Sequence, residues 1–169
     1  WPLYFTRGTS YERLEEWEKS EADLRQALEL EPDQPQVLNY LGYSFLELKT
    51  NLDEAMEMIR KAAEMRPQDG YITDSLAWGL YRLGRYEEAV EPMERAAELM
   101  PVDPIINDHL GDVYWAVGRV REARFQWKRA LSFDPEEDEA NRIRRKLEVG
   151  LDRVLIDEGE EPTRPINDG

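Results

Sequence analysis

The chain contains no cysteine and only one histidine among its 169 residues. The absence of cysteine excludes disulfide bonds, thiolate metal sites and cysteine nucleophiles. No apolar run approaches the roughly 20 residues that cross a bilayer, so direct membrane insertion is not expected. Basic residues are also scarce, because 22 Lys and Arg face 37 Asp and Glu and give a net charge of −15. Nucleic acid is therefore not an expected partner, since binding it requires a basic surface.

What the sequence does contain is a repeat. The pairs Ala96 and Ala130, and Pro101 and Pro135, are each separated by 34 residues. The same spacing continues toward the N-terminus with one inserted residue, which lies in the turn around 49–52. A period in this range is typical of helical repeat arrays. The sequence therefore predicts four units, at residues 1–34, 35–69, 70–103 and 104–137.

Each unit has the periodicity of two helices. In the fourth unit, Leu110, Val113 and Val117 recur at intervals of three and four, which is typical of an amphipathic helix. Gly118 ends that helix, and a second apolar stripe follows. At the start of the unit Asp103 precedes a proline, an arrangement that favours a helix N-terminus. We expect a pair of antiparallel helices in every unit.

These residues resemble the tetratricopeptide repeat (TPR) family, whose signature has a Leu-Gly pair, an aromatic residue, two small residues and a proline at a 34-residue period. The fourth unit matches the signature at Leu110, Gly111, Tyr114, Ala123, Trp127, Ala130 and Pro135. The first unit departs from it, with Arg7 at the Leu position and Ser20 at a small-residue position. The resemblance implies an all-α fold, a right-handed α-solenoid of four repeats. The chain also resembles the C-terminal repeats of exported TPR proteins of proteobacteria.

The two ends of the chain give further expectations. Residues 138–155 continue with helical periodicity and are expected to form one helix that caps the last repeat. Residues 156–169 are acidic and rich in proline and glycine, so we expect a disordered tail. At the N-terminus, Trp1, Tyr4 and Phe5 cluster in the first unit. Either further repeats precede them or this face contacts another copy of the chain, as in a homo-oligomer.

The resemblance also implies a binding groove lined by the first helix of each repeat. Carried onto this sequence, the groove combines aromatic side chains with acids and one amide. The candidate residues are Asn39, Tyr43, Glu47, Tyr71, Asp74, Trp78, Tyr81, Asp108, Asp112 and Trp115. Such a surface suits a protein or peptide segment that carries Arg or Lys beside apolar residues.

Two other features have a functional and a structural interpretation. Basic residues gather at 119–129 and 142–146, where they form either an anion-binding patch or, as we favour, the solvated faces of two helices. His109 lies between two acids, but it lacks a second histidine or a nucleophile, so a structural role is expected. No catalytic residues, metal or cofactor are predicted.

The sequence thus predicts a non-enzymatic TPR scaffold that binds a protein or peptide in its groove. One alternative is an assembly module that uses exposed repeat end faces. Another is an accessory C-terminal domain of a longer cell-envelope protein. A periplasmic or envelope location follows only from the family resemblance, and a cytoplasmic location is the alternative.

Overall fold

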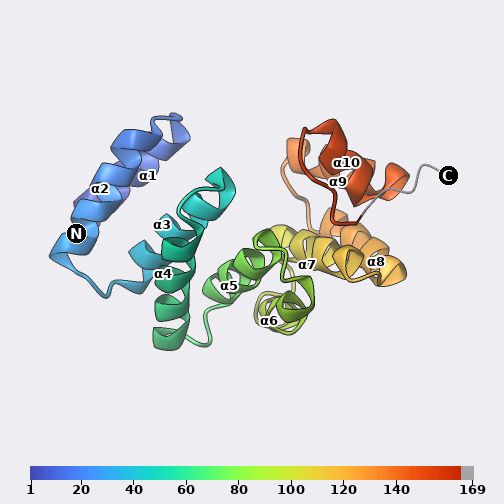
Figure 1. Ribbon diagram of the computed structural model, residues 1–169, viewed down its shortest axis with the longest axis horizontal. Coiled ribbons are helices and arrows are strands. Elements are labelled where there is room, and N and C mark those ends of the chain that lie inside the picture. The colour runs from blue at the N-terminus through green and yellow to red at the C-terminus, as the bar shows by residue number, and fades with distance from the viewer. Residues whose placement is uncertain (165–169) are drawn as a thin grey trace. The chain divides into compact units, whose positions relative to one another are not determined.

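The computed structural model describes residues 1–164, which form ten α-helices and no β-strand (Figure 1). The helix bounds are α1 Pro2–Arg13, α2 Trp17–Leu30, α3 Pro35–Leu48, α4 Leu52–Met65, α5 Gly70–Arg82, α6 Tyr86–Leu99, α7 Pro104–Ala116, α8 Val120–Ser132, α9 Glu137–Val149 and α10 Leu151–Asp157. The chain divides within α5 into two compact units, Trp1–Gly79 and Leu80–Gly169.

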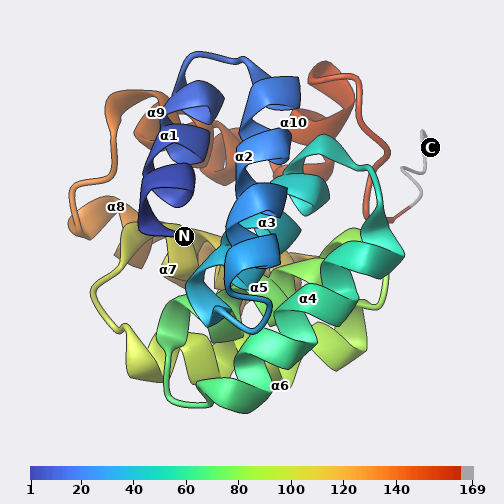
Figure 2. The ribbon, with the colours of Figure 1, turned by 90° about the vertical axis from the view of Figure 1, so that its left-hand side faces the viewer.

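In the first unit, α1 packs against α2 and α3 packs against α4 (Figure 2). Gly42 explains how closely α3 approaches α4, because a Cβ atom at this position would lie 2.7 Å from Ile59 Cγ1. Gly79 makes a similar approach, since its Cβ would lie 2.2 Å from the Met56 sulfur. Small residues at these positions therefore permit the helices to meet.

The first repeat compensates for one of its two departures from the family pattern, Arg7, but not for Ser20. Arg7 donates hydrogen bonds from Nε and Nη2 to the two carboxylate oxygens of Asp23, at 2.6 and 2.8 Å. This paired geometry links α1 to α2 where other repeats have an apolar contact. Ser20 is buried, and its hydroxyl has no hydrogen-bond partner within residues 1–164.

In the second unit, α7 packs against α8 and against α6. The predicted N-terminus of α7 is confirmed, because the Asp103 carboxylate accepts a hydrogen bond from the Ile106 amide at 3.0 Å and Pro104 follows the cap. Gly111 lies so close to Trp127 that a Cβ would be 2.4 Å from the indole ring. The fully buried Trp127 fills the space between the two helices.

The C-terminal region differs from the single capping helix expected for 138–155. It consists of two helices, α9 and α10, which are separated at Gly150 (Figure 1). Gly150 has a φ of +85°, a conformation that residues with a Cβ rarely adopt. The break turns the chain back, so that α10 packs against α9.

Candidate functional site

Two of the predicted groove residues, Asp108 and Asp112, lie one turn apart on α7 and share a cationic partner. Lys146 Nζ, on α9, donates a hydrogen bond to Oδ1 of each carboxylate at 2.8 Å. The Lys146 side chain is 0% exposed and that of Asp112 is 2% exposed. Asp112 also accepts a hydrogen bond at 3.0 Å from the indole nitrogen of Trp127. These acids therefore bind the chain's own lysine.

The electrostatics of this cluster follow from its burial. Burial raises the pKa of Asp112, and the charge of Lys146 acts in the opposite direction. A buried carboxylate of this kind is costly without a cation, because the one neutral hydrogen bond from Trp127 does not replace the solvation that its charge loses on burial. Lys146 therefore has a structural role in joining α9 to α7.

Trp115, which was expected to line an open groove, contacts the C-terminal region on several sides. Its indole nitrogen donates to Asp152 Oδ2 at 2.9 Å. The guanidinium carbon of Arg164 lies 5.3 Å from the ring centroid. At the α9–α10 junction, a Cβ on Gly150 would lie only 2.6 Å from the ring. The expectation of an open groove at α7 is therefore wrong, because α9, α10 and the following residues occupy this surface.

The expected disordered tail is also ordered by contacts as far as residue 164. Arg142 donates to both carboxylate oxygens of Glu158 at 2.9 Å, and this ion pair lowers the pKa of Glu158. The backbone amide of Thr163 donates to Asp152 at 2.6 Å. Glu160 pairs with Arg82 at 3.6 Å. Residues 165–169, the rest of the predicted tail, lie outside the described residues.

The candidate residues on α5 differ in exposure. Tyr71 is 55% exposed, whereas Asp74, Trp78 and Tyr81 are buried. Trp78 donates from its indole nitrogen to Glu47 Oε1 at 2.8 Å, so it fixes the position of that carboxylate. Burial raises the pKa of Tyr81, whose ring lies 5.3 Å from that of Tyr86.

The candidate residues on α3 are the most accessible group within the first unit. Asn39 and Tyr43 are partly exposed, and Glu47 is exposed. The Asn39 Oδ1 atom is itself buried, yet it accepts no hydrogen bond from any of the residues 1–164. An unsatisfied buried acceptor costs about 1–3 kcal/mol. A donor from outside the chain reaches this atom only when the partly exposed Asn39 side chain turns outward, and the hydrogen bond then formed would be stabilising.

Comparison with known proteins agrees with this architecture. Two tetratricopeptide repeat family models match the chain, one over residues 5–70 and the other over residues 71–100. The chain belongs to the TPR family. Its repeats make the chain a scaffold for protein–protein interaction.

Two bacterial relatives match about half of this TPR chain. A TPR repeat-containing protein of Pseudomonas aeruginosa is 39% identical over 83 residues, which cover 49% of this chain and 14% of the relative. A lipoprotein NlpI homolog of Haemophilus influenzae is 38% identical over 86 residues, 50% of this chain and 26% of the relative. The chain thus spans only a small part of the length of these relatives.

A solved structure shares the fold over more of the chain. MamA 41–end from Desulfovibrio magneticus RS-1 has a TM-score of 0.68 at 18% identity, over 94% of this chain and 85% of that one. At this identity the similarity establishes the all-α solenoid fold of TPR repeats. Within residues 1–164, no helix has the length and apolarity that crossing a membrane requires.

The basic residues of the TPR chain mostly contact its own groups. Arg119 pairs with Glu122, Arg124 donates to the Leu147 carbonyl at 2.8 Å, and Arg145 lies 3.4 Å from Asp157. These contacts favour the interpretation of 119–129 and 142–146 as helix faces rather than as one anion-binding patch. His109 is buried on α7.

Sequence reasoning missed the residues that cover α7. Lys146 and Gly150 continue the spacing of Ala140 and Ile143 by three and four residues, so they lie on the buried face of α9. A lysine on the apolar face of a capping helix needs a buried acidic partner. Asp108 and Asp112, on the repeat that this helix covers, were the candidates, so the ion pair could have been predicted. Nothing in the sequence pattern indicates that Arg164 packs on Trp115.

Proposed function

We propose that this TPR chain binds a segment of a partner protein on the α3 surface of its first unit. The observation that carries the proposal is the buried Asn39 Oδ1, which no donor within residues 1–164 satisfies. A backbone N–H of an extended segment would complete this hydrogen bond. Tyr43, one turn along α3, offers a partly exposed ring beside it.

The charge of the surface suggests the chemistry of the segment. Glu47 is exposed on α3, and its carboxylate accepts a hydrogen bond from the Trp78 indole. Because this bond already fixes the Glu47 side chain, a partner that binds it causes a smaller loss of side-chain conformational entropy. A carboxylate next to a tyrosine ring suits an Arg or Lys side chain. The proposed partner is therefore a segment with a basic residue beside an apolar one. The exposed Tyr71 supplies a further aromatic group on α5.

The test uses Asn39→Leu, which removes the unsatisfied acceptor and keeps a similar volume. The variant should lose most of the partner captured from extracts of the source organism, measured by quantitative mass spectrometry. The midpoint of its denaturant-induced unfolding should be the same as that of the parent chain or slightly higher, because the substitution removes a buried acceptor that destabilises the folded state. Gln36→Leu, an exposed position on the same helix, is the matched control. Unchanged capture by Asn39→Leu would refute the proposal.

Self-association through the N-terminal face is a second candidate, since Leu3 is 86% exposed and Leu14 is also exposed on and just after α1. A fall in mass for Leu3→Ser in light scattering would support it.

We also propose that the chain, with repeats at 1–34, 35–69, 70–103 and 104–137, is one part of a longer protein. The lipoprotein name of one relative suggests an envelope location for it. Fractionation of the full-length gene product tests this against a cytoplasmic location.

A further inference from the structure

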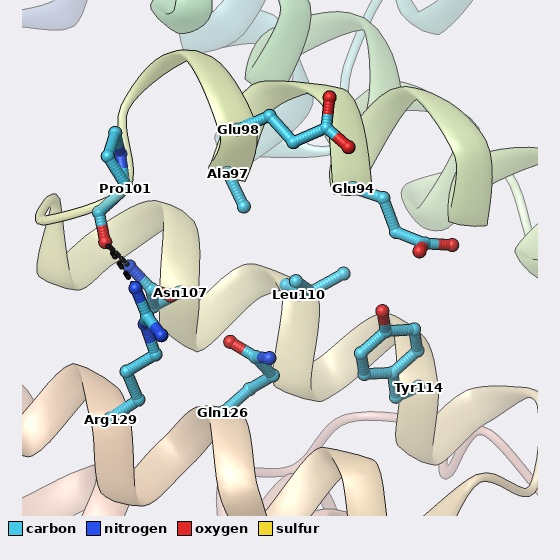
Figure 3. Close-up of a pocket in the computed structure, with 9 residues that line it drawn as sticks. All are labelled: Glu94, Ala97, Glu98, Pro101, Asn107, Leu110, Tyr114, Gln126 and Arg129. Carbon is cyan, nitrogen blue, oxygen red and sulfur yellow. Dashed lines mark hydrogen bonds between the residues drawn. The ribbon is translucent and has the colours of Figure 1, made fainter.

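A groove that the sequence analysis did not predict lies on the second unit, away from the covered surface of α7 (Figure 3). It has a volume of about 320 Å³. Figure 3 shows Glu94, Ala97 and Glu98 along one wall, from α6, with Gln126 and Arg129 opposite on α8. The floor comes from α7, with Asn107, Leu110 and Tyr114.

The floor is a packed and partly apolar surface. Leu110 and Tyr114 are both buried, and Asn107 donates to the backbone carbonyls of Pro101 and Asp103 at 3.2 and 2.7 Å. The polar group of Asn107 is therefore engaged in holding the α6–α7 connection. What remains accessible above it is the partly exposed side chain of Ala97, beside the buried Leu110.

The two walls carry opposite charge. On α6, Glu91, Glu94 and Glu98 follow one another at intervals of three and four, and together with Arg95 they line a neighbouring cavity of about 290 Å³. Such spacing places the carboxylates on one helix face. On α8, the exposed Arg129 lines the other side of the groove, and Arg121 and Lys128 are exposed on the same helix outside it. Neither Glu98 nor Lys128 has an ion-pair partner in the part of the chain that the structure describes.

Next to the basic residues is an exposed aromatic side chain. Phe125, on α8, is 61% exposed. Arg121 precedes it by four residues and Lys128 follows it by three, so the three side chains form one stripe along α8. An aromatic residue flanked by cations is the chemical complement of an apolar floor beside a row of carboxylates.

We propose that this groove binds the α8 stripe of a second copy of the chain, in a two-fold symmetric dimer. Phe125 of each copy enters the groove of the other and contacts the Leu110 and Ala97 side chains. Lys128 and Arg121 of each copy face the α6 carboxylates of the other. A single surface that carries both the stripe and the groove is self-complementary, as a two-fold contact requires.

The first test measures the mass of the 169-residue chain by sedimentation equilibrium over about a hundredfold range of concentration. The expected result is a monomer–dimer equilibrium. Phe125→Ser should raise the dissociation constant about tenfold or more, because a central aromatic anchor is lost. Its side chain is exposed in the single chain, so the thermal unfolding temperature should stay close to that of the parent chain. Leu30→Ser, at an exposed apolar position on α2, is the matched control and should leave the equilibrium unchanged.

The second test exchanges charges across the proposed contact. Glu98→Lys alone and Lys128→Glu alone should each weaken the dimer, because like charges then meet twice. An equimolar mixture of the two variants should form a heterodimer, since both contacts again pair a lysine with a glutamate. This restoration distinguishes a direct contact from a general effect of net charge.

Three outcomes would overturn the proposal. They are a monomer at every concentration, dissociation by Leu3→Ser but not by Phe125→Ser, and a mixture of the charge variants that stays monomeric. The first would leave the groove to a different protein, and the second would assign association to the N-terminal face.

Discussion

The first helices of the second and fourth repeats show two ways of using the same positions. Asn39 on α3 corresponds by repeat register to Asp108 on α7, and Tyr43 corresponds to Asp112. On α7 both polar groups are bonded to Lys146 of the same chain. On α3 the Asn39 acceptor has no donor within residues 1–164. The comparison shows that polar groups at these repeat positions can bind a cationic side chain. On α7 that side chain is Lys146 of α9.

The largest expected effect comes from removing the internal cation. Lys146→Met leaves Asp112 buried without its partner, so the free energy of unfolding should fall by about 3–5 kcal/mol. Urea denaturation followed by circular dichroism measures this fall. Asn39→Leu, at the corresponding position of α3, should not lower the free energy of unfolding. The two variants together therefore test the difference between the second and fourth repeats.

The double variant Asp112→Asn, Lys146→Met provides the control. An asparagine at 112 still accepts the hydrogen bond from Trp127 but carries no charge, so most of the lost stability should return. If the double variant is as unstable as Lys146→Met, loss of packing by the lysine stem, and not the unpaired charge, accounts for the effect.

A smaller effect is expected where the chain turns back over Trp115. Gly150→Ala places a methyl group against the indole and forces a residue with a Cβ into a positive φ. The free energy of unfolding should fall by about 1–3 kcal/mol. Gly84→Ala is the matched control, because Gly84 has a φ of +76° but no atom within 4 Å of its Cβ position.

The Gly84 variant measures backbone strain alone, and the excess loss in Gly150→Ala measures the contact with Trp115. Equal losses in the two variants would mean that the C-terminal helices shift away from the Trp115 ring without a loss of stability. The contact between these helices and α7 would then contribute little to the free energy of unfolding.

The smallest expected effect depends on pH. Arg142 lowers the pKa of Glu158, so this ion pair stabilises the folded chain above the ordinary glutamate pKa of about 4.3 and is lost as the pH falls through the lower folded value. Both side chains are more than one third exposed, so the contribution should be below about 1 kcal/mol. Urea denaturation of the parent chain and of Glu158→Gln at pH 6 and at about pH 3 tests this. The stability difference between them should be present at pH 6 and absent in acid, and a constant difference would contradict the assignment.

Much of the fold was predictable because the repeat spacing and the helix signals reinforce one another. Two features follow directly from residue types. Asp103 followed by Pro104 favours the N-terminus of α7, and Gly111 permits the close approach of α7 to α8. The family resemblance is confirmed over residues 5–100, which the two family models match. The break at Gly150 was missed, since a glycine within an apolar periodicity indicates neither a bend nor a direction.

The candidate site was harder to predict than the fold. Exposure of Trp115 depends on where α9, α10 and Arg164 pack, and such long-range packing has no periodic signal in the sequence. Trp78 was expected to face a partner, but it is buried and serves to hold Glu47. The groove between α6 and α8 involves residues from three helices, and only Phe125, a large apolar residue among cations, hinted at it.

The complete burial of Lys146 makes its amine a chemical reporter. Lys19, Lys61 and Lys128 are exposed and would react readily with an acylating reagent, whereas the Lys146 amine is shielded from water and tied to two carboxylates. Its labelling rate, followed by peptide mass spectrometry, would therefore report how often α9 detaches from α7 in the otherwise folded chain. A ligand that competed with α9 for that surface would reveal itself by accelerating this one modification.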